Sequence, residues 1–181
     1  MTKNVWLVGL VVLLLSTAGV AQAEGGSSRS HAENSNAYGW GLAFTIGEGM
    51  YFIDGDVYRG PVSLEVVPSF GWDWFKFDLG LYTTLESIKI AGTNVGNWNF
   101  TFRPGGRVTP PMLPLYGRIA FPLQLQKHNF DYGVMLGIGA DFPVTGILGI
   151  VVEVDTTLSD KLRWGGDGVP LEFRVGISLR F

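Results

Sequence analysis

The sequence predicts an all-β protein, and three observations support this prediction. Apolar residues alternate with small or polar residues, with a period of two, along most of the chain after residue 37. Of the 181 residues, 26 are Gly and only 16% are charged. This composition is too rich in glycine for a helical bundle and too apolar for a disordered chain. The alternating segments have about the nine to eleven residues with which a tilted strand crosses a bilayer. Together these observations predict an eight-stranded antiparallel up-and-down transmembrane β-barrel.

Residues 1–23 have the three-part layout of a secretory signal peptide. Lys3 gives a positive start, an apolar run extends from Val5 to Leu15, and the segment ends in Ala21-Gln22-Ala23, an A-x-A cleavage site. A transmembrane anchor is the alternative, but it needs about 20 apolar residues. We therefore expect cleavage of this segment during export, with the mature chain beginning at Glu24.

Residues 24–37 contain no apolar residue larger than Ala. A segment of this composition cannot bury enough apolar surface to fold, so it predicts a disordered N-terminal tail. His31 lies in this tail, where a lone histidine is more often inert than a metal or catalytic ligand.

Residues 38–181 are expected to form the barrel. The eight predicted strands occupy residues 39–47, 62–70, 75–82, 97–103, 115–126, 130–139, 148–155 and 171–181. Short turns are expected at 71–74, 108–112 and 142–146, and longer polar loops at 48–60, 86–96 and 159–168. Short periplasmic turns and longer outer loops are typical of outer-membrane barrels. An even number of strands then places both ends of the barrel in the periplasm.

The alternation alone does not say which face points inward, since a soluble lipocalin-like barrel would have its apolar face inside. Here the second face is rich in Gly, Ala, Ser and Thr, which suits a narrow eight-stranded lumen. The apolar face carries bulky residues on every strand, and it would aggregate if it faced water. Aromatic residues also gather near the strand ends, as expected at membrane interfaces. The predicted interface aromatics are Trp40, Trp72, Trp74, Trp98 and Tyr132.

The inward face then holds the charged residues of the strands. They are Glu65, Lys76, Asp78, Arg103, Arg118, Asp131, Asp141, Glu153, Asp155, Glu172, Arg174 and Arg180. Buried charges are costly unless paired, so we expect a polar network in the lumen. The last hairpin should bring Arg174 close to Glu153 and Asp155. A filled polar core is favoured over a gate, because an eight-stranded barrel has little spare volume.

The chain ends in Arg174-Val175-Gly176-Ile177-Ser178-Leu179-Arg180-Phe181. This segment resembles the C-terminal β-signal of bacterial outer-membrane proteins, with Arg174, Gly176, Leu179 and Phe181 at the motif positions. The resemblance implies that the barrel-assembly machinery recognises this strand. Residues 38–181 as a whole resemble the small outer-membrane barrels of the OmpA, OmpX and OmpW type, which implies an outer-membrane location in contact with lipid and lipopolysaccharide.

Catalytic and metal-binding chemistry is poorly represented in the sequence. Because the chain has no Cys, it has no thiolate nucleophile and no thiolate metal site. His128 lies beside Lys127 and Asn129 with no Ser in its loop, so we expect no catalytic role for it. The segment Asp54-Gly55-Asp56, with Glu48 nearby, is a candidate calcium loop, but calcium takes six to eight oxygens and a simple turn is favoured. We therefore expect no cofactor and no metal.

These observations favour a non-enzymatic outer-membrane protein with a structural or surface-interaction role through its outer loops. The net charge of −3 gives no reason to expect nucleic acid as a partner, and the extracellular ligand is unknown. A narrow channel for small or apolar solutes is the first alternative, implied by the OmpW-like resemblance. A membrane-embedded lipid-modifying enzyme is the second.

Overall fold

In a computed structural model of the chain, the described residues are 38–53, 55–90, 93–96, 100–111, 113–125, 130–158 and 169–181. The expected signal peptide (1–23) and tail (24–37) lie outside them, as do His31, Asp54, Trp98, His128 and the loop 159–168. The described residues contain no helix that is long and apolar enough to span a membrane.

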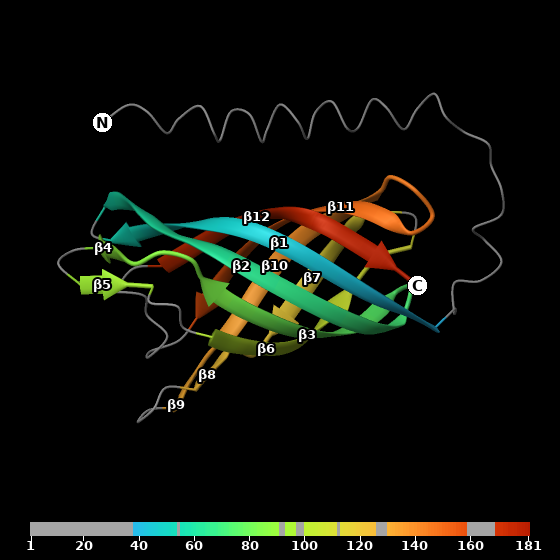
Figure 1. The fold of residues 1–181 in the computed structure, drawn as a ribbon, viewed down its shortest axis with the longest axis horizontal. Helices are drawn as coiled ribbons and strands as arrows, with labels where there is room; N and C mark the ends of the chain where they lie inside the picture. The colour runs from blue at the N-terminus through green and yellow to red at the C-terminus, as the bar shows by residue number, and fades with distance from the viewer. Residues whose placement is uncertain are drawn as a thin grey trace. The chain divides into compact units, whose positions relative to one another are not determined.

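The described part of the chain forms strands joined by turns and loops (Figure 1). The strands are β1 (Tyr38–Ile53), β2 (Asp56–Trp72), β3 (Phe75–Thr84), β4 (Ile88–Ile90), β5 (Thr93–Val95), β6 (Phe100–Val108), β7 (Leu115–Ala120), β8 (Leu123–Leu125), β9 (Phe130–Tyr132), β10 (Val134–Pro143), β11 (Leu148–Leu158) and β12 (Val169–Arg180).

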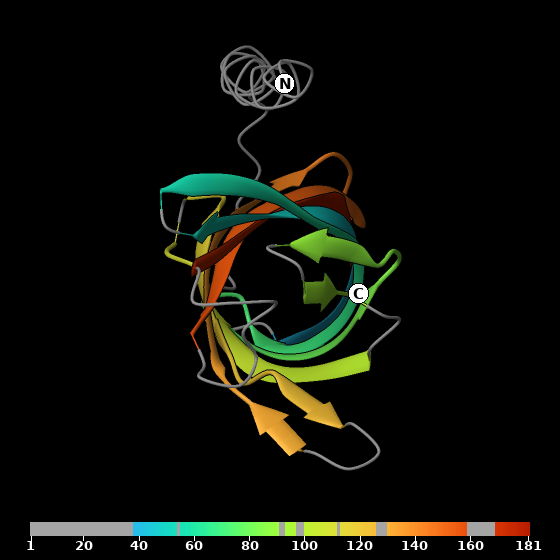
Figure 2. The same ribbon diagram turned by 90° about the vertical axis from the view of Figure 1, so that its left-hand side faces the viewer.

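The main sheet closes on itself. Its strands follow the order β3-β2-β1-β12-β11-β10-β7-β6, and β6 pairs back with β3, so no edge is left around the barrel. Figure 2 shows the resulting ring of strands from one end. All neighbouring pairs are antiparallel, which confirms the predicted eight-stranded antiparallel barrel.

Strands β8 and β9 continue β7 and β10 rather than adding to the ring. The pairing of Ala120 with Met135 continues in the same register to Leu123 and Tyr132. The interruption falls at Pro122, which has no backbone N–H to donate. The two strand pairs remain connected across this interruption, because Gly133 N–H donates to the Pro122 carbonyl oxygen over 3.1 Å.

The barrel has its apolar face outside and its polar face inside, as predicted. Phe77 and Leu136 are 44% and 41% exposed, whereas Glu65 and Asp78 are 1% and 0% exposed. Inward positions between the charges are occupied mainly by small residues such as Ala43, Gly80 and Ser63. The orientation expected for a barrel surrounded by lipid is therefore present in the described strands.

The prediction of a long loop at 48–60 is wrong. After a bulge between Glu48 and Met50, β1 and β2 stay paired up to Ile53 and Asp56, so that only a tight turn joins them. Gly55 at this turn has a φ of 88°, which other residues rarely adopt. The pairing continues beyond the part of the wall that is apolar outside, because backbone hydrogen bonds between strands do not require an apolar outer face.

The expected loop at 86–96 is also more ordered than predicted. It contains the two-stranded sheet β4–β5, in which Ile88 pairs with Val95 and Ile90 pairs with Thr93. This hairpin is separate from the barrel wall.

Candidate functional site

Charged side chains from six strands meet inside the barrel and form what we call the charged ring. Its members are Glu65 (β2), Asp78 (β3), Arg103 and Arg107 (β6), Arg118 (β7), Glu153 and Asp155 (β11), and Glu172 and Arg174 (β12). These strands place the residues inward because each lies on the polar face of its strand. Carboxylates and guanidiniums are nearly balanced in number, as buried charge requires.

Glu65 is the centre of the ring. Its carboxylate pairs with Arg118, with 2.9 Å between Oε1 and Nη2, and with Arg174 through Oε2. Arg103 Nη1 lies 3.8 Å from the same Oε2 atom. One carboxylate on β2 is therefore shared by guanidiniums from β6, β7 and β12 across the lumen.

Glu153 forms a second junction of the ring. Arg118 Nη1 donates to Glu153 Oε1 over 3.0 Å, and the Tyr116 hydroxyl donates to Oε2 over 2.7 Å. Arg174 Nη1 lies 3.7 Å from Glu153 Oε1 and 3.3 Å from Asp155 Oδ2, so the last hairpin brings these residues together as its geometry predicts.

Arg107 belongs to the ring although the sequence analysis did not include it. Its Nη2 atom donates to Asp78 Oδ1 over 3.0 Å, and Arg118 Nε lies 3.3 Å from Asp78 Oδ2. The predicted strand ended at Arg103, directly before Pro104-Gly105-Gly106. In the structure β6 continues through these residues to Val108. Arg103 and Arg107 lie four residues apart, and residues an even number apart in a strand lie on the same face. This spacing could have placed Arg107 in the lumen.

Three uncharged inward residues were also missed, and they contact the guanidiniums. The Arg103 Cζ atom lies 3.5 Å from the Tyr82 ring centroid, and Arg107 Cζ lies 4.9 Å from the Tyr116 ring centroid. Arg103 Nη1 also contacts Met135 Sδ at 3.5 Å. Cation–π contacts stabilise a buried guanidinium without adding charge. Their positions on the polar face of the alternation could have identified them.

Lys76, Asp141 and Arg180 were predicted to join the lumen network. Asp141 and Arg180 lie apart from the charged ring, whereas Lys76 lies next to the ring member Arg107. Arg180 Nη2 pairs with Asp141 Oδ1 at 2.7 Å, and the Ser178 hydroxyl donates to the same oxygen over 2.8 Å. Lys76 is partly buried near Arg180 and Asp141. The register explains this placement: Lys76 on β3 pairs with Arg107 on β6, whereas Arg180 pairs with Gly41, close to the strand end. The side chain of Asp131 lies outside the described residues.

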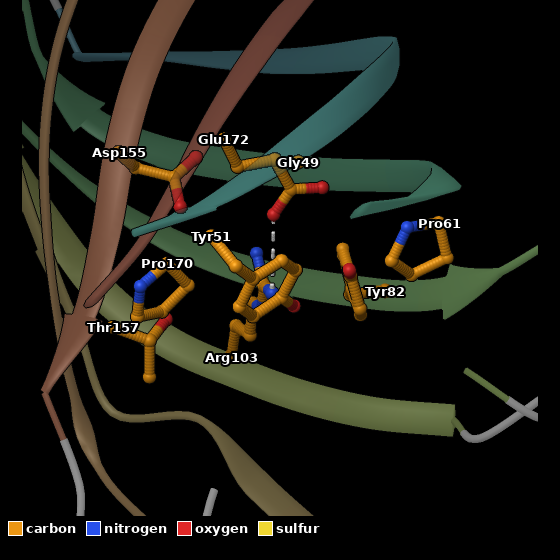
Figure 3. Close-up of a pocket in the computed structure, with 9 residues that line it drawn as sticks. All are labelled: Gly49, Tyr51, Pro61, Tyr82, Arg103, Asp155, Thr157, Pro170 and Glu172. Atoms are coloured by element: carbon orange, nitrogen blue, oxygen red, sulfur yellow. Dashed lines mark ion pairs between the residues drawn. The ribbon is translucent and has the colours of Figure 1, made fainter. Parts of the chain in front are cut away.

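The charged ring separates two small cavities in the lumen. The cavity nearer β4–β5 has a volume of about 20 Å³. Its lining residues are Gly49, Tyr51, Pro61, Tyr82, Arg103, Asp155, Thr157, Pro170 and Glu172 (Figure 3). Figure 3 shows the ion pair between Arg103 and Glu172 in this cavity, whose Nη2 and Oε2 atoms are 3.8 Å apart.

The second cavity lies beside Thr45, Asp78 and Tyr116 and has a volume of about 10 Å³. Cavities of these sizes hold about one water molecule each. Between them, the side chains of Glu65, Arg118, Arg174 and Glu153 are only 0–5% exposed. These four side chains are therefore packed against one another between the two cavities.

The ring is suited to pairing charges rather than to holding a metal. In the part of the chain that the structure describes, no three Asp, Glu or His side chains are grouped as metal ligands. Each ring carboxylate instead faces guanidinium groups. A guanidinium donates hydrogen bonds, has no acceptor atom and keeps its positive charge. The candidate calcium loop contains Asp54, which lies outside the described residues.

Aromatic side chains cluster on β1, β2 and the turn between β2 and β3, near the end of the barrel at which the C terminus lies. Trp40, Trp72 and Trp74 are all exposed. Tyr38 packs edge-on against Trp72, with ring centroids 5.9 Å apart, and Trp40 packs against Phe70 at 5.5 Å. Tyr132 on β9 is also exposed. Trp98 lies outside the described residues, so the second predicted group of aromatics is described only in part.

The four residues of the β-signal motif lie on or directly after β12, each in a different environment. Arg174 is in the charged ring, and Gly176 lies against β1, where it pairs with Thr45. Leu179 pairs with Leu42. Phe181 is exposed, and its N–H donates to the Trp40 carbonyl oxygen over 2.9 Å. This strand therefore closes the barrel on β1, and the Phe181 side chain that follows it is exposed.

Comparisons with known structures identify the fold. Neisserial surface protein A matches with a TM-score of 0.54 at 9% sequence identity, over 78% of this chain and 97% of that protein. The attachment invasion locus protein Ail of Yersinia pestis, in complex with the heparin analogue sucrose octasulfate, also has a TM-score of 0.54. It is 12% identical, over 79% of this chain and 99% of Ail. No protein-family model and no curated protein sequence matches the chain. The chain has the fold of the small eight-stranded outer-membrane β-barrels.

Proposed function

We propose that the protein is an integral barrel of the bacterial outer membrane with a closed lumen and a non-enzymatic, structural or surface-interaction role. The lipid-facing wall anchors the protein, and the outer loops contact what lies outside the cell. Residues 1–23 direct export, both ends of the barrel face the periplasm, and the assembly machinery recognises β12. The partners are outer-membrane lipid, lipopolysaccharide and, during biogenesis, that machinery.

The membrane location is supported by the outer surface of the barrel. Large apolar side chains cover it, including Phe44, Ile46, Leu64, Phe77, Leu79, Leu81, Ile119, Leu136, Ile138, Ile150, Val175 and Ile177, all of which are exposed. Such a surface would aggregate in water but is favourable against acyl chains. A closed barrel also leaves no strand edge unsatisfied within hydrocarbon.

The closed lumen is supported by one observation above the others, the charged ring. Arg118 joins Glu65, Asp78 and Glu153, which come from three different strands. Breaking such buried pairs leaves uncompensated charges and is strongly unfavourable. We therefore expect the ring to block the free diffusion of ions.

Single-channel recording of the refolded protein in planar bilayers tests this proposal. The parent protein is expected to show no large, stable open state. The substitution Arg118→Ala removes the side chain that joins three carboxylates. This variant should show channel openings that the parent protein lacks. The matched control is Ile119→Ala, since Ile119 is the next residue of β7 and faces outward. Heat-modifiable migration on gels should show that all three proteins are folded.

Two other functions would give other experimental results. A large, stable pore or the flux of apolar solutes through the parent protein would favour the narrow conduit. Hydrolysis or transfer of membrane lipid that is lost in His128→Ala would favour a lipid-modifying enzyme. Equal recordings from Arg118→Ala and Ile119→Ala would show that the charged ring is not the barrier.

A further inference from the structure

The hairpin β4–β5 lies at the end of the barrel opposite the C terminus (Figure 1). Viewed along the barrel, both strands lie inside the ring formed by the wall, toward one side of it (Figure 2). Hence the segment that follows β3 turns over the mouth of the barrel instead of extending away from it.

The side chain of Glu86 in this segment is bound to the rim of the barrel by two polar contacts. Arg59 on β2 pairs with Glu86, with 2.6 Å between Nη2 and Oε1, and its Nε atom pairs with Glu48 on β1. The same Glu86 oxygen accepts the N–H of Val62 over 2.9 Å. Next to it, Leu85 N–H donates to the Val62 carbonyl oxygen over 2.8 Å. We call Glu48, Arg59 and Glu86 the latch.

Apolar packing continues the contact between the hairpin and the mouth. Ile88 of β4 packs against Tyr51 together with Ile53 and Tyr58. After β5, a Cβ added at Gly96 would lie 3.1 Å from Pro61 Cβ and collide with the Glu86 carbonyl oxygen. Both sides of the hairpin are therefore held closely against the rim.

The residues beneath the hairpin belong to the larger lumen cavity. Tyr51, against which Ile88 packs, is 4% exposed and lines this cavity with Tyr82 and Arg103. Pro61, which Gly96 approaches, also lines it. The hairpin thus packs directly against residues that line this cavity, and the charged ring lies on the other side of the cavity.

We propose that β4–β5 is a lid over the outer mouth of the lumen, held closed by the Glu48–Arg59–Glu86 latch. The lid controls the access of water to the cavity above the charged ring, which has room for about one water molecule. Since the latch side chains are 34–43% exposed, the ion pairs are screened by salt. The lid is therefore expected to open more often as ionic strength rises.

A single reporter thiol tests this proposal in the full barrel, because the chain has no Cys of its own. Thr84→Cys is the reporter: Thr84 is 0% exposed, on the polar face of β3 directly before the lid segment. The refolded protein in vesicles is treated with a charged, membrane-impermeant thiol reagent, and the labelling rate is measured. Heat-modifiable migration confirms that each variant is folded.

We expect slow labelling with the intact latch, and labelling that is roughly two- to fivefold faster in Arg59→Ala or Glu86→Gln, since exposed ion pairs have effects of this size. Lys89→Ala is the matched control, because it removes an exposed charge from the same hairpin. High salt should speed labelling with the intact latch but not in Arg59→Ala. Equal rates in all the variants, or the absence of a salt effect, would overturn the latched lid.

This test is distinct from that of the closed lumen. Opening the lid leaves the charged ring intact, so Arg59→Ala should label faster without forming a stable ion-conducting pore. A stable pore in Arg59→Ala would contradict the closed lumen and its charged ring, whereas unchanged labelling would contradict the lid alone.

Discussion

Glu86 illustrates how one carboxylate can connect a loop to the barrel wall. The hydrogen bond from the Val62 N–H lowers the pKa of Glu86 below its ordinary value of 4.5, and the Arg59 guanidinium lowers it further. A carboxylate with a lowered pKa stabilises the folded state above its unfolded pKa, and this contribution is lost as pH falls through the folded pKa. The latch should therefore remain intact at neutral pH and weaken only under acidic conditions.

The Val62 amide proton should report this titration by NMR. Its chemical shift is expected to change with a midpoint below pH 4.5, since its acceptor is the Glu86 carboxylate. Glu86→Gln should abolish that transition. A midpoint at or above 4.5 in the parent protein would contradict the hydrogen bond from Val62.

The charged ring shows which site residues a sequence can reveal. Glu65, Asp78 and Arg118 were predictable because each interrupts an inward row of small residues with a charge. Arg107 was missed because Pro and Gly usually end strands, yet paired neighbours on both sides keep β6 regular. Which arginine pairs with which carboxylate was beyond prediction, apart from the last hairpin, because it depends on the register of non-adjacent strands.

At the scale of elements, the strands of the wall were predictable and the loops were not. Alternation identifies a strand wherever one face meets lipid and the other meets the lumen. Toward the tip of the β1–β2 hairpin the two faces no longer differ clearly in polarity, so the alternation does not show how far the strands extend. There β1 and β2 are held by backbone pairing and by the contact of Arg59 with Glu48. The short β4–β5 hairpin has too few residues for a periodic pattern.

Strand β12 gives the prediction at this scale. A Cβ at Gly176 would collide with the Phe44 carbonyl oxygen and lie 2.7 Å from Thr45 Cα, so Gly176→Ala should disrupt the β1–β12 seam. We expect a loss of about 1–3 kcal/mol in the free energy of unfolding, as for other overpacked sites. Gly117→Ala is the control, because a Cβ there meets no atom within 4 Å. It should change stability by less than about 0.5 kcal/mol.

Refolding into detergent, without any assembly machinery, separates two roles of Gly176. If Gly176 matters for packing, Gly176→Ala gives little heat-modifiable protein in the purified system. Normal refolding of this variant, combined with failed assembly in cells, would instead assign Gly176 to recognition of the β-signal alone.

For the whole molecule, the decisive property is that the apolar surface and the polar network have exchanged the places they occupy in a soluble protein. The closed sheet satisfies its backbone internally, and the charged ring takes the position of a hydrophobic core. The environment of the outer wall then determines stability, and a charge placed on that wall tests the environment directly. Arginine at the bilayer midplane costs about 2–4 kcal/mol and near the interface about 0–1 kcal/mol.

Ile46 and Val57 form the matched pair for this test, since both are exposed and belong to the same β-hairpin. Ile46 pairs with Leu64 on β2, next to Glu65 at the level of the charged ring, whereas Val57 lies near the tip beyond the belt. We expect Ile46→Arg to lower the free energy of unfolding in lipid vesicles by about 2–4 kcal/mol, and Val57→Arg by at most about 1 kcal/mol. Denaturant unfolding in vesicles measures both values. Equal, small effects at the two positions would mean that Ile46 does not face hydrocarbon, and the proposed membrane location would then have to be abandoned.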